Sequence, residues 1–181
     1  EDGKEQAERT ALAVLHAPDQ TMGRLDGLIR ELQLSGGEIQ KSMELLSNLA
    51  FPDKRKRAIP QSALWVYGIS GDLPIVVSRP PEKEDPNGAL LLKAHQLLTR
   101  CGYAFDLVYL LSDGGDYRSP QKSELTEMVK SLGLEGMLRK KGGIHLVEQS
   151  EPENESLWND WAAVIVDAAG QWKDQRKAPA Q

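Results

Sequence analysis

Four short apolar runs, each separated from the next by a helical pattern, constrain the fold of this chain more than any other feature. The runs cover residues 73–78, 105–111, 144–148 and 163–167, and each is nearly continuous in its apolar character. Such a run is typical of a strand that is buried on both faces. Strands that alternate with helices are joined by crossovers and lie parallel in one sheet. The pattern therefore predicts a small three-layer α/β domain with a mainly parallel four-stranded sheet.

The residues before these runs predict a helical arm. Apolar residues recur at helical spacing over residues 4–16, 21–34 and 38–50. Helices this short cannot close a large core alone, so we expect the arm to pack on the following domain or on a partner. We accordingly divide the chain into a helical arm and linker (1–59), a small α/β domain (60–170) and a polar, frayed tail (171–181).

The composition argues against several kinds of partner. The 181 residues carry a formal net charge of −5, which disfavours non-specific binding to nucleic acid or to an anionic membrane surface. No apolar run reaches the roughly 18 residues that a membrane-spanning helix needs, and residues 1–5 do not resemble a signal peptide. The single cysteine, Cys101, permits no internal disulfide, so we expect a reducing compartment and a cytoplasmic chain. Since the first residue is Glu1, we expect a processed chain or an excised fragment.

Two local patterns carry specific expectations. Residues 54–57 (KRKR) form a compact basic run without interleaved aromatic residues. We interpret this run as a solvated linker rather than as a phosphate or nucleic-acid contact. Ser119 is followed by Pro120, which predicts a helix with Ser119 as its N-cap and Pro120 at its first position.

The stretch from Ala63 to Val77 is the least ordinary part of the chain. It joins two aromatic residues, two closely spaced glycines and an aspartate to the first apolar run. A dinucleotide-binding loop has to follow a strand and open a helix, whereas these glycines precede the strand. Ser70 likewise lacks the strand–turn–helix setting of a nucleophile elbow. We therefore expect a tight turn, with the glycines at positive φ or in close backbone contact.

Six residues of this stretch are candidates for carbohydrate binding or for an interface with another domain. If they are structural, Asp72 should accept hydrogen bonds from backbone N–H groups or pair with a basic group, and the aromatic rings should be mostly covered by the arm or by a partner domain. Replacing Asp72 by alanine should then destabilise the chain, whereas in a sugar site it should weaken binding instead. The candidates are Trp65, Tyr67, Gly68, Ser70, Gly71 and Asp72.

The sequence predicts no catalytic residue, no metal site and no cofactor. The histidines (His16, His95 and His145) lie in different predicted elements, and none has an HExxH or CxxC setting. The loops that follow the first two predicted strands carry several carboxylates, but their spacing matches no calcium-binding loop. These carboxylates are Glu82, Glu84, Asp85, Asp113 and Asp116.

Two tryptophans near the carboxyl end, Trp158 and Trp161, are three residues apart in a predicted helix of about residues 151–161. They therefore share a helix face. Packing in a core or an interface is the favoured role for such a pair, ahead of a platform for a sugar ring.

Residues 64–75 read LWVYGISGDLPI, and residues 46–53, 93–98 and 105–110 flank this string in a recognisable order. On these residues, the segment from about 5 to 170 resembles the middle of large bacterial β-1,2-glucan enzymes. These are the cyclic β-1,2-glucan synthases and the 1,2-β-oligoglucan phosphorylases, which are related to cellobiose phosphorylase in the former "glycosyltransferase 36" group. The chain departs from the usual pattern in its charged loop at 80–86 and in Gly114-Gly115.

The resemblance implies a role in carbohydrate metabolism within a larger transferase or glycoside phosphorylase. Catalysis in such enzymes uses a carboxylic acid in a helical barrel domain, which this chain does not resemble, so no catalytic residue can be assigned here. The chain is then expected to be a fragment: a non-catalytic linker plus α/β module. Its partners would be the remaining domains of the parent enzyme and, in the parent, β-glucan, with no nucleic acid and no membrane contact by this segment.

Several alternatives stay open at this point. The parent could be a synthase, which would be associated with the inner membrane, or a phosphorylase. The chain could also be an independent small α/β enzyme or ligand-binding domain that uses the loops at the carboxyl edge of the sheet. A third possibility is a carbohydrate-binding module that uses Trp65 and Tyr67.

Overall fold

The computed structural model describes residues 19–81, 85, 87–112, 119–148 and 154–177. The helix predicted at 4–16 lies outside the described residues, as do four of the loop carboxylates, Glu82, Glu84, Asp113 and Asp116. The chain divides into two compact units, which we describe separately. Unit 1 comprises residues 1–53 and 90–104, and unit 2 comprises residues 54–89 and 105–181.

Unit 1 is helical. It contains α2 (Asp19–Glu31), α3 (Gly36–Leu49) and, from Leu90 onward, α4 (Gly88–Arg100). The N-cap of α3 is Ser35, whose hydroxyl accepts a hydrogen bond of 3.2 Å from the Glu38 N–H. Ion pairs then join α4 to the other two helices, from Lys93 to Glu38 at 3.1 Å and from Arg100 to Glu31 at 2.8 Å. The apolar patterns at 21–34 and 38–50 therefore predicted α2 and α3 correctly to within a few residues.

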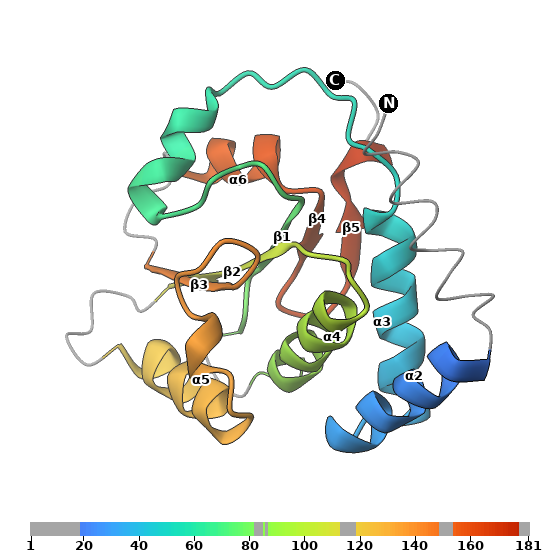
Figure 1. The fold of residues 1–181 in the computed structure, drawn as a ribbon. Helices are drawn as coiled ribbons and strands as arrows, with labels where there is room; N and C mark the ends of the chain where they lie inside the picture. The colour runs from blue at the N-terminus through green and yellow to red at the C-terminus, as the bar shows by residue number, and fades with distance from the viewer. Residues whose placement is uncertain (1–18, 82–84, 86, 113–118, 149–153, 178–181) are drawn as a thin grey trace. The chain divides into compact units, whose positions relative to one another are not determined.

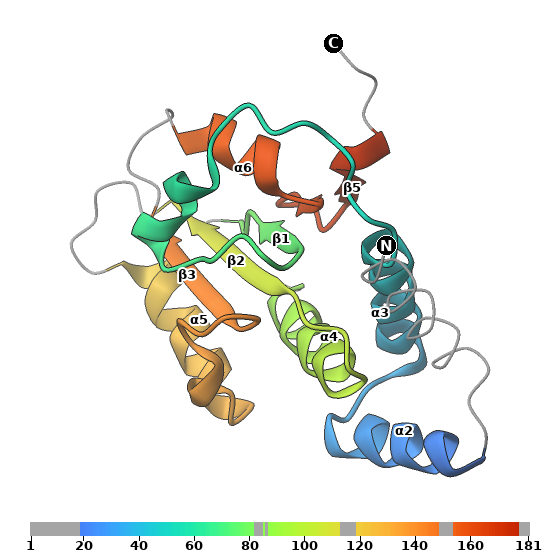
Figure 2. The same ribbon diagram turned by 45° about the horizontal axis from the view of Figure 1, so that its top comes forward.

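Unit 2 contains one mainly parallel sheet in the order β3-β2-β1-β4-β5 (Figures 1 and 2). The first four strands are mutually parallel, and β5 runs antiparallel to β4. The four predicted strands are present, and the α/β class is confirmed. The bounds are β1 (Ile75–Ser78), β2 (Asp106–Leu111), β3 (Ile144–Glu148), β4 (Val164–Val166) and β5 (Trp172–Asp174).

The fifth strand lies in the segment predicted to be a polar, frayed tail. Trp172 pairs with Val166 and Asp174 pairs with Val164 across the edge of the sheet, and the 3₁₀ helix η4 (Gln175–Lys177) follows. Arg176 donates to the Asp174 carboxylate at 2.8 Å, which anchors this end. An edge strand is only partly buried and needs no continuous apolar run. The tail prediction is therefore wrong for residues 172–177.

Unit 2 also contains a 3₁₀ helix before β1, and two α-helices and a second 3₁₀ helix between β1 and β4. They are η1 (Gln61–Tyr67), α5 (Pro120–Ser131), η2 (Glu135–Met137) and α6 (Glu155–Trp161). Pro120 opens α5 as predicted, but Ser119 does not cap it through its side chain. Ser119 has φ 40° and ψ 64°, a left-handed conformation rather than the extended one of an N-cap residue. Ser119 is therefore the N-cap residue by position, as predicted, but its side chain makes no capping hydrogen bond.

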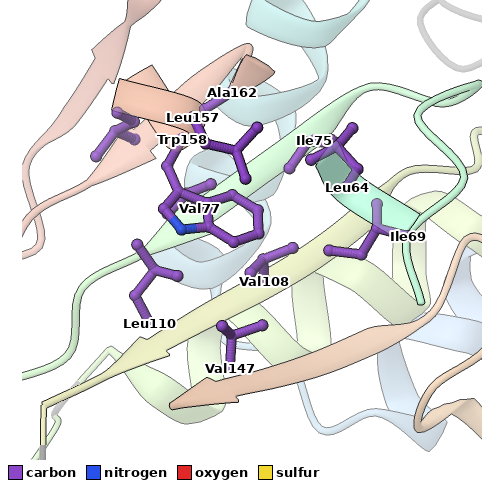
Figure 3. Packing of buried hydrophobic residues seen from close by; sticks show 11 residues of the cluster. Leu64, Ile69, Ile75, Val77, Val108, Leu110, Val147, Leu157, Trp158 and Ala162 are labelled. Atoms are coloured by element: carbon purple, nitrogen blue, oxygen red, sulfur yellow. The ribbon is translucent and has the colours of Figure 1, made fainter. Parts of the chain in front are cut away.

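The core of unit 2 on one face of the sheet is centred on Trp158 of α6 (Figure 3). Trp158 is 0% exposed, and its ring lies 5.2 Å from that of Tyr67. Figure 3 shows the indole directed from α6 toward the strands that carry Val77 and Val108. Leu64 and Ile69, from η1 and the turn after it, join the same cluster. The core role predicted for Trp158 is thus confirmed, and η1 covers this face of the sheet together with α6.

The basic run at 54–57 is fastened to the carboxyl end of α6. Arg55 donates to the Ala162 carbonyl oxygen at 2.7 Å, and Arg57 lies over the Trp161 ring at 4.9 Å. The Asp160 carboxylate accepts hydrogen bonds from the N–H groups of the next two residues, Ala58 and Ile59, at 2.9 and 2.8 Å. A helix ends with unpaired carbonyl groups and a partial negative charge, both of which suit arginine. The prediction of a solvated linker is therefore wrong for Arg55 and Arg57.

Candidate functional site

The candidate stretch begins as the 3₁₀ helix η1 and ends in a glycine turn. Gly68 caps η1 with φ 73°, and its N–H donates to the Trp65 carbonyl oxygen at 3.0 Å. Gly71 has φ 82°, and a Cβ atom there would lie 2.8 Å from the Gln61 side chain. Both glycines occupy the left-handed region that residues with a Cβ rarely adopt. The expected positive φ values are confirmed.

The polar side chains of this stretch close the turn. Gln61 donates to the Ser70 carbonyl oxygen at 2.7 Å and to Asp72 Oδ1 at 3.0 Å. Asp72 Oδ2 forms an ion pair with Lys141 at 2.8 Å, and the Asp72 N–H donates to Ser70 Oγ at 3.3 Å. The hydrogen bond from Lys141, and then that from Gln61, lower the pKa of the Asp72 carboxyl. The expected pairing of Asp72 with a basic group is confirmed.

The aromatic residues of the stretch differ in exposure. Tyr67 is half-buried and packs on Trp158. Trp65 is 63% exposed and Val66 is 81% exposed, although the Trp65 indole N–H donates to the Ser70 carbonyl oxygen at 3.4 Å. The chain as described thus leaves Trp65 largely uncovered. Its cover by a partner domain stays a prediction.

Replacing Asp72 by alanine is now expected to leave the melting temperature nearly unchanged at pH 7. The Asp72 side chain is 55% exposed, so water can replace it as a partner of Lys141 and Gln61. The loss of stability that follows when buried donors lose their acceptor therefore does not apply. Because its pKa is lowered from 3.8, any contribution is present above that value and disappears as the pH falls through the folded-state pKa. Thermal denaturation of both proteins at pH 7 and pH 3 tests this, and a large loss at pH 7 would show that the pair is structural.

A pocket of about 410 Å³ adjoins this stretch within unit 2. Its walls are residues 66–68 at the end of η1, residues 145–148 of β3, Lys122 of α5 and Arg139. Because β3 is the last strand on its side of the sheet, the pocket lies along a sheet edge. Tyr67 and Gly68 are the candidate residues from the sequence that line it, whereas Ser70, Gly71 and Asp72 do not.

A buried acid–histidine pair lies behind one wall of this pocket. Asp106 Oδ1 accepts hydrogen bonds from His145 Nε2 at 2.9 Å and from the Gly142 N–H at 2.8 Å. Asp106 is 0% exposed and His145 is 2% exposed. An ionised carboxylate can only accept, so Nε2 carries the proton. Within the described part of the chain, Asp106 Oδ2 and His145 Nδ1 are buried and have no hydrogen-bond partner.

The loop that carries Arg139 is held in a constrained conformation. Arg139 has φ 59°, a value that is uncommon for a residue with a side chain. Its N–H donates to the Ile144 carbonyl oxygen at 2.9 Å, and the Gly143 N–H donates to the Lys140 carbonyl oxygen at 2.9 Å. A Cβ atom at Gly143 would overlap the Met137 carbonyl oxygen. Because Asp106 also binds Gly142, one buried carboxylate links this loop to His145.

Sequence reasoning missed most of the pocket. His145 was considered only as a possible zinc ligand, and Lys122, Arg139 and Glu148 were not singled out. These residues come from separate elements, so no local motif joins them. The signal that was present is Asp106, a carboxylate inside an otherwise apolar strand, because a buried charge needs a partner.

The other candidates from the sequence do not form a comparable site. Asp85 accepts a hydrogen bond from the Asn87 N–H at 2.9 Å, and burial raises the pKa of its carboxyl. Burial likewise raises the pKa of the Cys101 thiol, and the side chain is half-buried. Among the residues that the structure describes, no three His, Cys, Asp or Glu side chains are grouped so as to hold a metal ion.

Comparison with known proteins gives no family assignment, because no family model, no curated protein and no solved structure matches this chain. In the described ranges, none of the helices has both the length and the apolar character needed to cross a membrane.

Proposed function

We propose that this chain is a non-catalytic linker plus α/β module of a large β-1,2-glucan-active phosphorylase or synthase. The observation that carries the proposal is the exposed apolar pair Trp65 and Val66, which are 63% and 81% exposed. Both belong to the string LWVYGISGDLPI, on which the resemblance to those enzymes rests. Covering these two side chains with another protein part would remove apolar surface from water, which is favourable.

The way the same stretch uses its polar groups supports this proposal. Gln61 and Asp72 bind the turn itself and Lys141, and they leave the apolar side chains outermost. Such an arrangement suits a rigid turn that presents a hydrophobic contact. The partners in this proposal are the remaining domains of the parent enzyme, and the α/α barrel of the parent would carry out the glycosyl transfer or phosphorolysis.

The proposal includes three finer points of the architecture and setting. It takes unit 2 as a three-layer arrangement, with η1 and α6 against one face of the sheet and α5 against the other, an arrangement that Figure 1 supports. It takes the module to be cytoplasmic, in keeping with its single cysteine. It also takes the segment to contact neither nucleic acid nor a membrane.

The double variant Trp65→Ser/Val66→Ser tests the interface. In the isolated chain we expect an almost unchanged melting temperature, because both side chains are exposed. In the full-length parent we expect the module to detach more readily, which faster release by limited proteolysis would reveal. Phe51→Ser is the matched control, since Phe51 is 62% exposed but lies outside the string.

Two results would contradict the proposed function. One is a full-length protein in which the double variant and the Phe51→Ser control are released at the same rate. The other is a gene whose reading frame closes with stop codons on both sides of this segment, so that no barrel domain is encoded with it.

A further inference from the structure

We propose that the outer edge of β3 is a docking site for an extended polypeptide segment, which adds to the sheet as a further strand. β3 is the last strand on its side of the sheet (Figure 2), and the pocket of about 410 Å³ runs along its residues 145–148. The edge and its pocket define this site without reference to any parent enzyme. That the docking segment belongs to the remaining domains of the parent rests on the proposed function.

Two hydrogen bonds at the start of β3 show which of its main-chain groups face away from β2. The Gly143 carbonyl oxygen accepts from the Leu107 N–H of β2 at 3.0 Å. The Ile144 carbonyl oxygen accepts instead from the Arg139 N–H at 2.9 Å, on the outer side of β3. Successive residues of a strand direct their N–H and C=O groups to alternate sides. The next outward-facing main-chain groups of β3 are therefore those of Leu146.

The outer edge of β3 already carries the first bridge of a parallel ladder. Leu138 pairs with Ile144 in parallel orientation, next to the hydrogen bond from Arg139. Arg139 then has φ 59°, a left-handed conformation that strands do not use. Within the described ranges, the main-chain N–H and C=O groups of Leu146 have no hydrogen-bond partner. The ladder thus stops at the point where an incoming strand can continue it.

The pocket beside this edge has walls on both faces of the sheet. Val147 belongs to the core cluster around Trp158, and Tyr67 packs against the same cluster. Side chains alternate along a strand, so Glu148 points to the opposite face, where it pairs with Lys122 at 2.7 Å. Tyr67 and Lys122 both line the pocket. A ligand between these walls therefore lies in the plane of the sheet, at the position of an added strand.

The two edges of the sheet differ in how they are protected. β5 has three residues and includes Lys173 and Asp174, and short, charged edge strands are a usual defence against pairing with other chains. β3 has five residues, and the first four, Ile144 to Val147, include no lysine, arginine, carboxylate or proline. An edge strand of this length and apolar character is open to pairing unless another segment covers it. β3 is therefore the edge on which a strand would add.

The walls of the pocket specify the side chains that the docking segment needs. On one face it meets Val66, which is 81% exposed, and the ring of Tyr67, so apolar residues suit that side. On the other face it meets the ion pair of Lys122 with Glu148, so polar residues suit that side. A segment of alternating apolar and polar residues meets both requirements, with affinity from its main chain. A second copy of this chain would bring identical walls to the same edge, whereas a single extended segment brings none.

The binding test uses the whole chain labelled with ¹⁵N and a synthetic heptapeptide of alternating threonine and valine, with lysine at each end for solubility. We expect saturable shifts of the amides of residues 66–68 and 145–148. Hydrogen exchange of the Leu146 amide should slow when the peptide binds, whereas that of His145, which faces β2, should change little. The same peptide methylated on the amide nitrogens of its five central residues should not bind, because it has lost the donors that a ladder needs.

Two variants at one position separate the main-chain contact from the side chain. Leu146→Pro removes the outward N–H, and proline is tolerated in an edge strand where the N–H faces away from the sheet. Peptide affinity should fall about tenfold or more, because a main-chain hydrogen bond is lost and the proline ring obstructs the edge. Leu146→Ala is the matched control, since it loses the same side chain and keeps the N–H. Its peptide affinity should stay within a few-fold of that of the unchanged chain.

The outcomes are distinct. Absence of saturable peptide binding, equal binding of the methylated peptide, or equal affinities in Leu146→Pro and Leu146→Ala would each overturn the docking site. So would a concentration-dependent dimer that protects the Leu146 amide without peptide, because the occupant would then be a second copy. Binding that is lost in Leu146→Pro and kept in Leu146→Ala supports the site. If the peptide binds but the Leu146 amide exchanges equally fast in the full-length parent and in this chain, the site stands and its link to the parent fails.

Discussion

Trp158→Ala is expected to lower the free energy of unfolding by about 3–5 kcal/mol, the usual loss when a buried tryptophan is truncated. Trp158 is 0% exposed and is the largest side chain of the core cluster on its face of the sheet. The change leaves a cavity beneath α6 and removes the contact with Tyr67 at 5.2 Å. Denaturant unfolding, followed by far-ultraviolet circular dichroism, measures the loss.

Trp158→Phe is the control for this prediction. The indole N–H of Trp158 is buried and has no hydrogen-bond partner among the described residues. Phenylalanine keeps a ring against Tyr67 and removes this unpaired donor, so it should cost much less than alanine. Equal losses for the two variants would mean that the ring does not pack as the structure has it.

Asp106→Ala is expected to lower the free energy of unfolding by several kcal/mol, because each buried donor that loses its acceptor costs about 1–3 kcal/mol. The change leaves His145 Nε2 and the Gly142 N–H without their acceptor, in a region where Asp106 is 0% exposed. It should also free the loop of Arg139. Urea unfolding gives the energy, and hydrogen exchange at the Gly142 amide reports the loop.

Asp106→Asn is the matched variant for this second prediction. Its carbonyl oxygen can still accept from His145 and Gly142, and its amide group would replace Oδ2, which is buried without a partner in the described part of the chain. We therefore expect a smaller loss than for alanine. If asparagine were as damaging as alanine, the negative charge rather than the two hydrogen bonds would be what the fold requires.

The strands of this chain could be predicted because burial on both faces leaves a direct trace in the sequence. Residues 144–148 were predicted as a strand and are β3, and the other three runs contain β1, β2 and β4. The strand β5 left no such trace, since Trp172-Lys173-Asp174 is polar and sits at an edge. Its partner β4 is close in the sequence, since Val166 pairs with Trp172, but three residues without an alternating apolar pattern are too few to indicate a strand.

The same distinction explains the errors at Arg55 and Arg57. A basic run is usually solvated. Here Arg55 donates to carbonyl oxygens at the carboxyl end of α6, about a hundred residues later in the chain, so the contact cannot be predicted from the run itself. The glycine turn at 68–71 was predictable because positive φ is a property of the residue type itself. The pocket was not, because Lys122, Arg139 and His145 meet only once the sheet has brought their elements together.

The position of β1 in the sheet has a consequence for synthesis on the ribosome. β1 lies between β2 and β4, and its Val76 pairs with Val164 of β4. One edge of β1 therefore has no hydrogen-bonding partner until nearly the whole chain has emerged. Trp158 arrives equally late. In the nascent chain β1, β2 and β3 can therefore pair into a partial sheet before β4 has been made. Until then the edge of β1 that will pair with β4 is exposed. Contacts of such long range close slowly, and until they do that edge is open to chaperones or to another nascent chain.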